Sequence, residues 1–127
     1  MSDLSGLRAL VVEDEGSVAM LIESMLEDLG CQTAASVTTL AKALQAARSE
    51  TFDFAVLDVN LRGEPSFPVA EVLKERGLPF VFSTGYGRLG LPDAFKAHEV
   101  LNKPFSMEEL AHSVRSILNR DSLRQGS

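Results

Sequence analysis

Five short apolar runs of β-forming residues alternate along the chain with segments of helical periodicity, and this alternation constrains the fold more than any other feature. In chain order the runs are Leu7–Val12, Cys31–Val37, Phe52–Leu57, Pro79–Ser83 and His98–Leu101. Strands that alternate with helices favour a parallel sheet with short, right-handed crossover connections. We therefore predict a (βα)5 domain of the α/β class.

Helical spacing of apolar residues, at i, i+3, i+4 and i+7, follows the first, second and fifth runs, and a weaker version follows the third. Gly30 and Gly77 are expected to end the first and third helices. Ser106 and Glu109 have the spacing of a capping box at the start of the last helix. We expect residues 1–120 to form one domain and residues 121–127 to be a disordered tail.

The segment between the fourth and fifth runs departs from this pattern. It has the sequence GYGRLGLPDAFKAH, with three glycines and a proline in its first eight residues. A glycine costs roughly 1 kcal/mol in a helix interior and a proline about 3 kcal/mol. The fourth helix is therefore expected to be weak or partly disordered. Tyr86 and Phe95 lie in this segment and are candidates to face a partner.

Charge and cysteine content exclude several classes of protein. A net charge of -6 argues against nucleic acid as a partner, because phosphate contacts need clustered lysine and arginine. Cys31 is the single cysteine, so no internal disulfide can form. No apolar stretch is long enough to span a membrane, since the first run ends in three acidic residues. We expect a cytoplasmic protein.

Carboxylates stand at the ends of two of the predicted strands. Glu13 and Asp14 follow the first strand, and Asp58 follows the third. In an open α/β sheet of order 2-1-3-4-5, ligands bind at the carboxyl ends of these two strands. Two carboxylates 4 Å apart repel by about 4 kcal/mol at an effective dielectric near 20. A cation would offset that repulsion, and a set of oxygen ligands without histidine or cysteine suits Mg²⁺ rather than zinc.

A hydroxyl and an ammonium group stand at the ends of the other two strands. Thr84 ends the fourth strand, and Lys103 follows the fifth. Together with Asp58 and a divalent cation, they are the groups expected in a site where an aspartate accepts a phosphoryl group. Thr84 and Lys103 would hold the phosphoryl oxygens by hydrogen bonds. Each motif alone has a simpler interpretation, as helix-capping acids or as turn residues. Chance does not account for four such motifs in this order at the strand ends.

The motifs LVVEDE, VLDVNLRG, FSTGYG and NKPF stand in the order found in two-component response regulator receiver domains, which the chain resembles over Leu7 to Arg120. The resemblance implies a flavodoxin-like three-layer sandwich with strand order 2-1-3-4-5. It also implies a phosphoryl group transferred to Asp58, with Thr84 as the switch hydroxyl and Lys103 as the phosphate-binding lysine. The implied Mg²⁺ ligands are Asp14 and Asp58 directly, Asn60 through its backbone carbonyl and Glu13 through water.

Two departures from the family pattern are visible. Val100 stands where the family has an aromatic switch residue, so the usual coupling of an aromatic ring to Thr84 is excluded. The stretch PFVFSTGYG resembles the motif PFxFATGYG of one subgroup. In this chain Ser83 replaces the alanine of that motif. In that subgroup the fourth helix is weak or missing, and its members are similar to regulators served by HWE-type histidine kinases.

The resemblance implies a stand-alone receiver that is not an enzyme beyond its own phosphorylation and dephosphorylation. A histidine kinase or phosphotransfer protein would supply the phosphoryl group, and a downstream protein would be its target. Alternatives are a phosphate shuttle or sink, and a pseudo-receiver that only binds partners. A phosphatase of the haloacid-dehalogenase kind is disfavoured, because its nucleophile follows the first strand and Asn60 stands where its acid would be.

Overall fold

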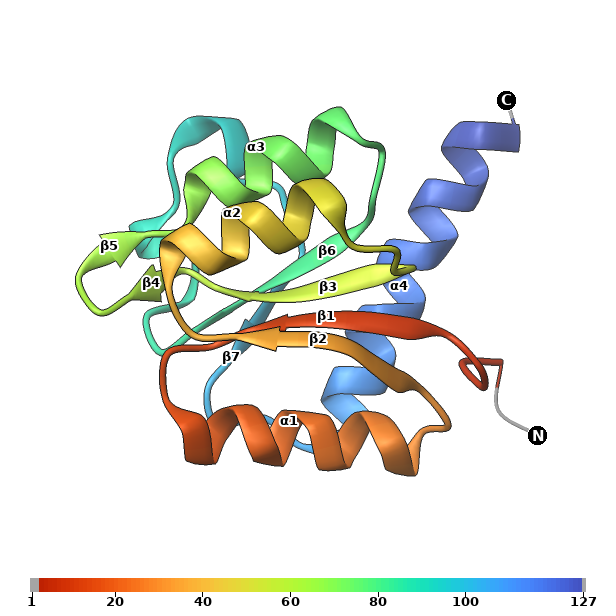
Figure 1. Ribbon diagram of the computed structural model, residues 1–127. Coiled ribbons are helices and arrows are strands. Elements are labelled where there is room, and N and C mark those ends of the chain that lie inside the picture. Colours follow the sequence, from red (N-terminus) through yellow and green to blue (C-terminus); the bar gives the residue numbers. More distant parts are fainter. Residues whose placement is uncertain (1–2, 127) are drawn as a thin grey trace.

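Five parallel strands form a single central sheet in the computed structural model (Figure 1), which describes residues 3–126, and side chains as far as residue 119. The strands are β1 (Arg8–Val12), β2 (Gln32–Val37), β3 (Phe54–Asp58), β6 (Phe80–Thr84) and β7 (Val100–Asn102). Their order across the sheet is β2-β1-β3-β6-β7. Counting only these five strands, this is the order 2-1-3-4-5, so the predicted fold class is confirmed.

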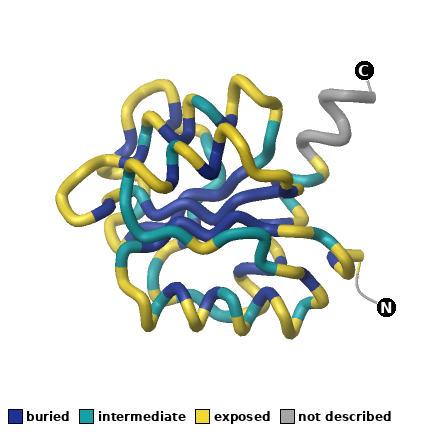
Figure 2. Tube along the Cα trace, viewed as in Figure 1, coloured by how far each residue is buried: buried dark blue, intermediate teal, exposed yellow. Residues whose placement is uncertain are grey.

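Helices cover both faces of the sheet (Figure 1). Helices α2 (Leu40–Ser49) and α3 (Phe67–Glu75) pack on one face, and α1 (Gly16–Asp28) and α4 (Met107–Gly126) pack on the other. Each pair of helices encloses its own hydrophobic cluster, and the central strands β1, β3 and β6 are the most deeply buried part of the chain (Figure 2). The result is a three-layer sandwich.

The helices begin and end where local chemistry favours it. Thr39 accepts a hydrogen bond from the backbone amide of Lys42, 3.3 Å away, at the start of α2. Gly30 and Gly77 follow the ends of α1 and α3 with φ of 90° and 69°, a conformation in which glycine avoids the steric cost of a Cβ. Both glycines stand where the sequence predicted that a helix would stop.

Alternation along β3 determines which side its terminal carboxylate faces. Phe54 and Val56 belong to the cluster beneath α1 and α4, whereas Ala55 and Leu57 belong to the cluster beneath α2 and α3. Successive side chains of a strand point to opposite faces, so Asp58 follows Val56 on the side of α1 and α4. All five residues are buried, which requires a strand covered on both faces.

Two short 3₁₀ turns, Gly87–Gly90 and Asp93–Phe95, replace a fourth α-helix between β6 and β7. The predicted weakness of this helix is confirmed. Tyr86 is 80% exposed, as expected for a residue that could face a partner. The expectation for Phe95 is wrong, because its ring is buried against Phe67 and Phe82. This aromatic contact anchors the second turn to the sheet.

A short antiparallel hairpin follows β3 and was not predicted from the sequence. Its strands are β4 (Asn60–Leu61) and β5 (Glu64–Pro65). The two residues of the turn, Arg62 and Gly63, both have positive φ, 54° and 87°, as hairpin turns of this length favour. The Asn60 side-chain oxygen accepts a hydrogen bond from the Gly63 amide at 2.6 Å, which stabilises the turn.

Helix α4 continues to Gly126, through residues for which the sequence analysis expected a disordered tail. No proline or glycine interrupts the sequence between residues 121 and 125, and leucine, arginine and glutamine are good helix formers. The domain boundary at residue 120 and the disorder beyond it stay predictions, because a helical conformation is not a measure of order. Residue 127 lies outside the described part of the chain.

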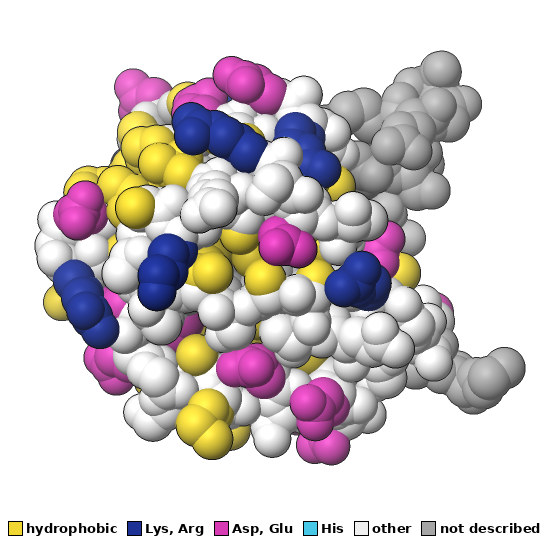
Figure 3. Space-filling view, viewed as in Figure 1, with side chains coloured by type: hydrophobic (Ala, Val, Ile, Leu, Met, Phe, Trp, Pro, Cys, Tyr) yellow, Lys and Arg dark blue, Asp and Glu magenta, His cyan; other side chains and the backbone are white. Residues whose placement is uncertain are grey.

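Two general properties of the described residues bear on function. None of their helices combines the length and the apolar character needed to cross a membrane. On the face seen in Figure 3, acidic and basic side chains are interspersed, and the described residues form no continuous basic patch there.

The capping box predicted at the start of α4 is present, and its loss should lower stability. The Ser106 hydroxyl accepts a hydrogen bond from the Glu109 amide (3.1 Å), and the Ser106 amide donates to the Glu109 carboxylate (3.0 Å). Replacing Ser106 by alanine should lower the free energy of unfolding by about 1 kcal/mol in urea titrations. Ser24→Ala, on the exposed side of α1, is the control and should have no destabilising effect. Equal stability of the two variants would contradict the assigned cap.

Candidate functional site

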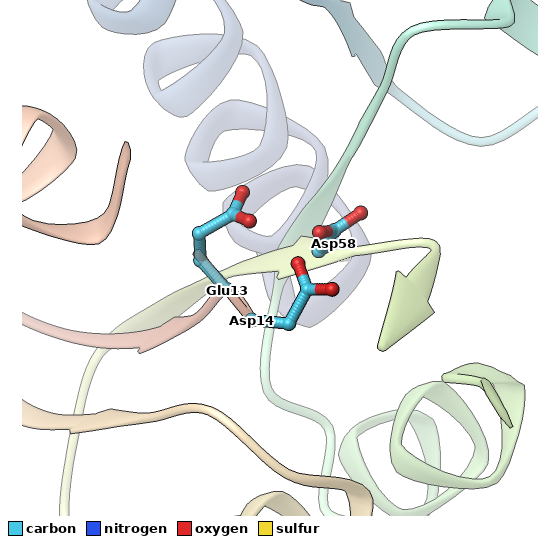
Figure 4. Close-up of side chains that lie close together, drawn as sticks. All are labelled: Glu13, Asp14 and Asp58. Carbon is cyan, nitrogen blue, oxygen red and sulfur yellow. The ribbon is translucent and has the colours of Figure 1, made fainter. Parts of the chain in front are cut away.

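Three carboxylates meet at the carboxyl ends of β1 and β3 (Figure 4). Glu13 and Asp14 directly follow β1, and Asp58 is the last residue of β3. Each offers an oxygen, and these oxygens all lie within 4.8 Å of one another. The cluster arises because β1 and β3 are neighbours in the sheet, with Val12 opposite Leu57. The convergence predicted from the sequence is therefore observed.

A single lysine partly neutralises this cluster. The Lys103 ammonium lies 2.7 Å from the Glu13 Oε1 atom and 3.2 Å from the Asp58 Oδ2 atom. Glu13 is 1% exposed and Asp58 is 6% exposed, so water screens their charges poorly. Three carboxylates facing one ammonium leave a net negative site made of hard oxygen ligands. This donor set fits Mg²⁺, which takes one or two carboxylates and keeps several waters.

The environment of Asp58 favours its protonated form when no further cation is present. Burial and the neighbouring charge of Glu13 raise the pKa of Asp58 from 3.8 to about 7, although Lys103 acts in the opposite direction. A carboxyl with such a pKa is poised between its two forms near neutral pH. Additional positive charge would favour the ionised form, which is the nucleophilic one.

Asp14 is held in place by the hairpin that follows β3. Its Oδ2 atom accepts a hydrogen bond from the Arg62 backbone amide at 3.0 Å. Partial burial raises the pKa of Asp14, but hydrogen bonds with Glu13 and with the Arg62 amide outweigh it and lower the pKa overall. Asp14 therefore remains ionised next to Asp58. Sequence reasoning missed this role of Arg62; the turn-forming Gly63 was the available signal.

Asn60 lies on β4 of the same hairpin and contacts the Asp58 carboxylate through its backbone. Its amide donates a hydrogen bond to the Asp58 Oδ1 atom at 3.3 Å. Its side chain holds the hairpin, as described above. The role of its carbonyl as a metal ligand remains a prediction.

Thr84 and Lys103, at the carboxyl ends of β6 and β7, are joined through their backbones. The Lys103 amide donates to the Thr84 carbonyl at 2.8 Å, and the Lys103–Pro104 peptide bond is cis. The Thr84 hydroxyl accepts a hydrogen bond from the Tyr86 amide at 3.1 Å, which ties it to the 3₁₀ segment. Val100 lies opposite Phe82 in the sheet and packs against the α2–α3 cluster, so no aromatic ring occupies this position.

The predicted site residues thus divide into two groups. Glu13, Asp14, Asp58 and Lys103 form one contact cluster. Thr84 ends β6, the strand next to β3, and Asn60 belongs to the hairpin that follows β3. All of them lie at the same edge of the sheet.

Comparison with known proteins identifies related sequences. A family model described as the response regulator receiver domain matches residues 9–115. The transcriptional activator protein IrlR of Burkholderia pseudomallei is 33% identical over 127 residues, covering 95% of this chain and 54% of the relative. The chain spans about half the length of the curated relatives that it matches.

Solved structures show the same architecture. The solution structure of SdrG from Sphingomonas melonis Fr1 is 43% identical, with a TM-score of 0.80, covering 93% of this chain and 99% of that one. The structure described as the BeF₃-activated conformation of SdrG from Pseudomonas melonis Fr1 is 41% identical, with a TM-score of 0.76. It covers 90% of this chain and 98% of that one.

Proposed function

This chain belongs to the response regulator receiver domain family, and on that premise we propose that Asp58 accepts a phosphoryl group in a two-component phosphorelay. The observation that carries the proposal is the buried Asp58 carboxylate, which lies 3.2 Å from the Lys103 ammonium beside two further acids. A structural carboxylate in such a position would be costly, whereas a nucleophile at the end of a rigid strand needs these neighbours.

In the proposed reaction, a side-chain oxygen of Asp58 forms a bond to phosphorus. The bond between phosphorus and a donor histidine nitrogen breaks, and the donor imidazole keeps the electron pair. Lys103 and Thr84 hold the phosphoryl oxygens by hydrogen bonds. When bound, Mg²⁺ would offset the charge of the phosphoryl oxygens, and Glu13, Asp14, Asp58 and the Asn60 carbonyl are the residues that would hold it. Hydrolysis of the acylphosphate resets the site, so the chain acts only on itself.

The proposed partners are a histidine kinase or phosphotransfer protein upstream and a protein target downstream. Action as a stand-alone receiver, residues 1–120, is supported by the likeness to SdrG over 99% of that chain. Action as a phosphate shuttle or sink is the alternative. The motif PFVFSTGYG and the 3₁₀ segment support an HWE-type kinase. The proposal includes a cytoplasmic location and neither nucleic acid nor membrane as a partner, in keeping with the net charge of -6.

Intact-mass measurement after mixing with Mg²⁺ and a small acyl-phosphate donor tests the proposal. We expect the chain to gain the mass of one phosphoryl group and to lose it again once the donor is removed. No mass gain with the small donor or with a reconstituted histidine kinase would reject it and would favour a pure binding module.

Phosphorylation should also order the segment that follows β6. The Thr84 hydroxyl already accepts a hydrogen bond from the Tyr86 amide. A hydrogen bond from the same hydroxyl to a phosphoryl group would therefore restrain residues 85–92. We expect amide hydrogen exchange in this segment to slow by roughly threefold or more after phosphorylation, while exchange in α2 is unchanged. Equal exchange in both states would exclude coupling through this segment.

A further inference from the structure

A buried hydroxyl on the strand next to Asp58 has no assigned role. Ser83, on β6, is 1% exposed, and its Oγ atom has no hydrogen-bond partner in the described part of the chain. Buried polar groups are nearly always hydrogen-bonded, so an unpartnered one needs a specific explanation. In the PFxFATGYG motif that the sequence resembles, this position is an alanine, so the subgroup pattern does not demand a hydroxyl.

Strand register places Ser83 directly beside the acceptor. Ser83 pairs with Asp58 on β3 and with Leu101 on β7. Neighbouring parallel strands lie about 4.8 Å apart, and paired residues point to the same face. Val81 and Leu101 belong to the cluster beneath α1 and α4, so by alternation Ser83 faces that side, as Asp58 does. The next residue on this face, Gly85, carries no side chain.

The Lys103 side chain reaches its partners across β6, the strand that carries Ser83. It starts beyond β7, and its ammonium lies against Asp58 on β3 and Glu13 after β1. The strand between them is β6, and Ser83 is the side chain that β6 presents at that level. A lysine ammonium has three N–H donors, and two of them are directed to Glu13 and Asp58.

We propose that Ser83 is a positioning residue. Its buried hydroxyl, between Asp58 and Lys103 on the same sheet face, accepts a hydrogen bond from the Lys103 ammonium when that ammonium leaves Glu13. Departure is expected when a divalent cation is held at Glu13 and Asp14, because like charges repel. Ser83 would then keep the ammonium next to Asp58, where the incoming phosphoryl oxygens need it. The inference rests on the proposed function but is tested separately from it.

The first experiment observes the Lys103 ammonium directly by ¹H–¹⁵N spectroscopy, with Mg²⁺ as the probe. With Mg²⁺, we expect its protons to exchange with water roughly three- to tenfold faster in Ser83→Ala than in wild type, as loss of a hydrogen bond to a charged group predicts. Without Mg²⁺, Glu13 and Asp58 hold the ammonium and the two proteins should agree. The signal is assigned by its absence in Lys103→Met. Equal exchange with Mg²⁺ would overturn the proposal.

The second experiment is a double-mutant cycle on the rate of phosphoryl uptake. Ser83→Ala should slow uptake roughly three- to tenfold in the wild-type background and should have no effect in Lys103→Met. The same slowing in both backgrounds would overturn the proposal, because Ser83 would not act through Lys103. If wild type takes up no phosphoryl group, the proposed function fails, and the ammonium measurement still decides the role of Ser83.

Stability measurements separate this role from a structural one. Removing an unpartnered buried hydroxyl should leave the melting temperature of Ser83→Ala unchanged or higher. Thr33→Val is the matched control, because Thr33 on β2 carries another buried hydroxyl without a partner, away from the site. The control should change neither lysine exchange nor uptake. A Ser83→Ala variant that is slow only because it is destabilised would contradict the inference.

Discussion

Replacing Asp58 by asparagine should abolish phosphoryl uptake from a small acyl-phosphate donor in the presence of Mg²⁺. The amide has nearly the same shape as the carboxylate but lacks the nucleophilic oxygen, so no acylphosphate forms. In intact-mass spectra the wild type should gain one phosphoryl group, while Asp58→Asn should keep its starting mass. The expected loss of rate is at least 100-fold and is limited by the sensitivity of the measurement.

Two further variants make this result specific. Asp28→Asn, on the exposed side of α1, should behave as wild type. Asp14→Asn should retain the nucleophile but respond weakly to Mg²⁺, so its rate should fall less than that of Asp58→Asn. Mass gain in Asp58→Asn would show that another residue is the acceptor and would reject the assignment of Asp58.

Mg²⁺ should stabilise the fold strongly at pH 8 and weakly at pH 5.5. A cation that binds only the folded carboxylate cluster stabilises by about 2.7 kcal/mol at a concentration 100 times its dissociation constant. For a domain of this size that corresponds to a rise of roughly 10 °C in melting temperature. Protons compete with the cation, because the pKa of Asp58 is raised to about 7. Scanning calorimetry with and without Mg²⁺ at both pH values measures the difference.

Without Mg²⁺, the pH dependence of stability should have the opposite direction. Because the pKa of Asp58 is higher in the folded state than its ordinary value of 3.8, the folded state binds this proton more tightly than the unfolded state does. The free energy of unfolding therefore rises as pH falls from about 7 toward 4, by at most about 4 kcal/mol at 1.36 kcal/mol per pKa unit. The lowered pKa of Asp14 and the raised pKa of Lys103 act outside this range.

Asp58→Asn is the control for both pH effects. This variant lacks the titrating carboxyl, so proton uptake at residue 58 should not raise its free energy of unfolding between pH 7 and pH 4. Its stabilisation by Mg²⁺ should be reduced at every pH. It should also be more stable than wild type at pH 8 without Mg²⁺, because the repulsion from Glu13 is removed. A wild type whose metal-free stability falls as pH drops from 7 to 5.5 would contradict the raised pKa.

The fold was predictable from local signals that do not depend on tertiary contacts. β3 was recognised from its run of apolar, β-forming residues, and α1 from the spacing of residues such as Ile22 and Leu26. The absence of an α-helix between β6 and β7 was predicted from the helix propensities of glycine and proline. The hairpin after β3 was missed because its strands have two residues each, too few for any periodicity.

The chemistry of the site was predictable in kind but not in detail. Glu13, Asp14 and Asp58 were assigned correctly to one cluster because parallel strands expose their carboxyl ends at one edge. The Arg62 amide that holds Asp14 was missed, because any residue supplies a backbone amide and only the neighbouring Gly63 indicated a turn. Phe95 was misjudged for a related reason: exposure in an irregular segment depends on which ring it meets, here Phe67 and Phe82.

The order and spacing of residues alone determined the α/β class, the positions of the strand ends and the set of reactive groups, because these follow from short-range periodicity and side-chain chemistry. Tertiary structure decided what depends on distance across the sheet. It set the contact of Lys103 with Glu13 and Asp58, the raised pKa of Asp58 and the burial of the Ser83 hydroxyl. Charges that are far apart in the chain interact strongly only when folding brings them together and removes the water between them.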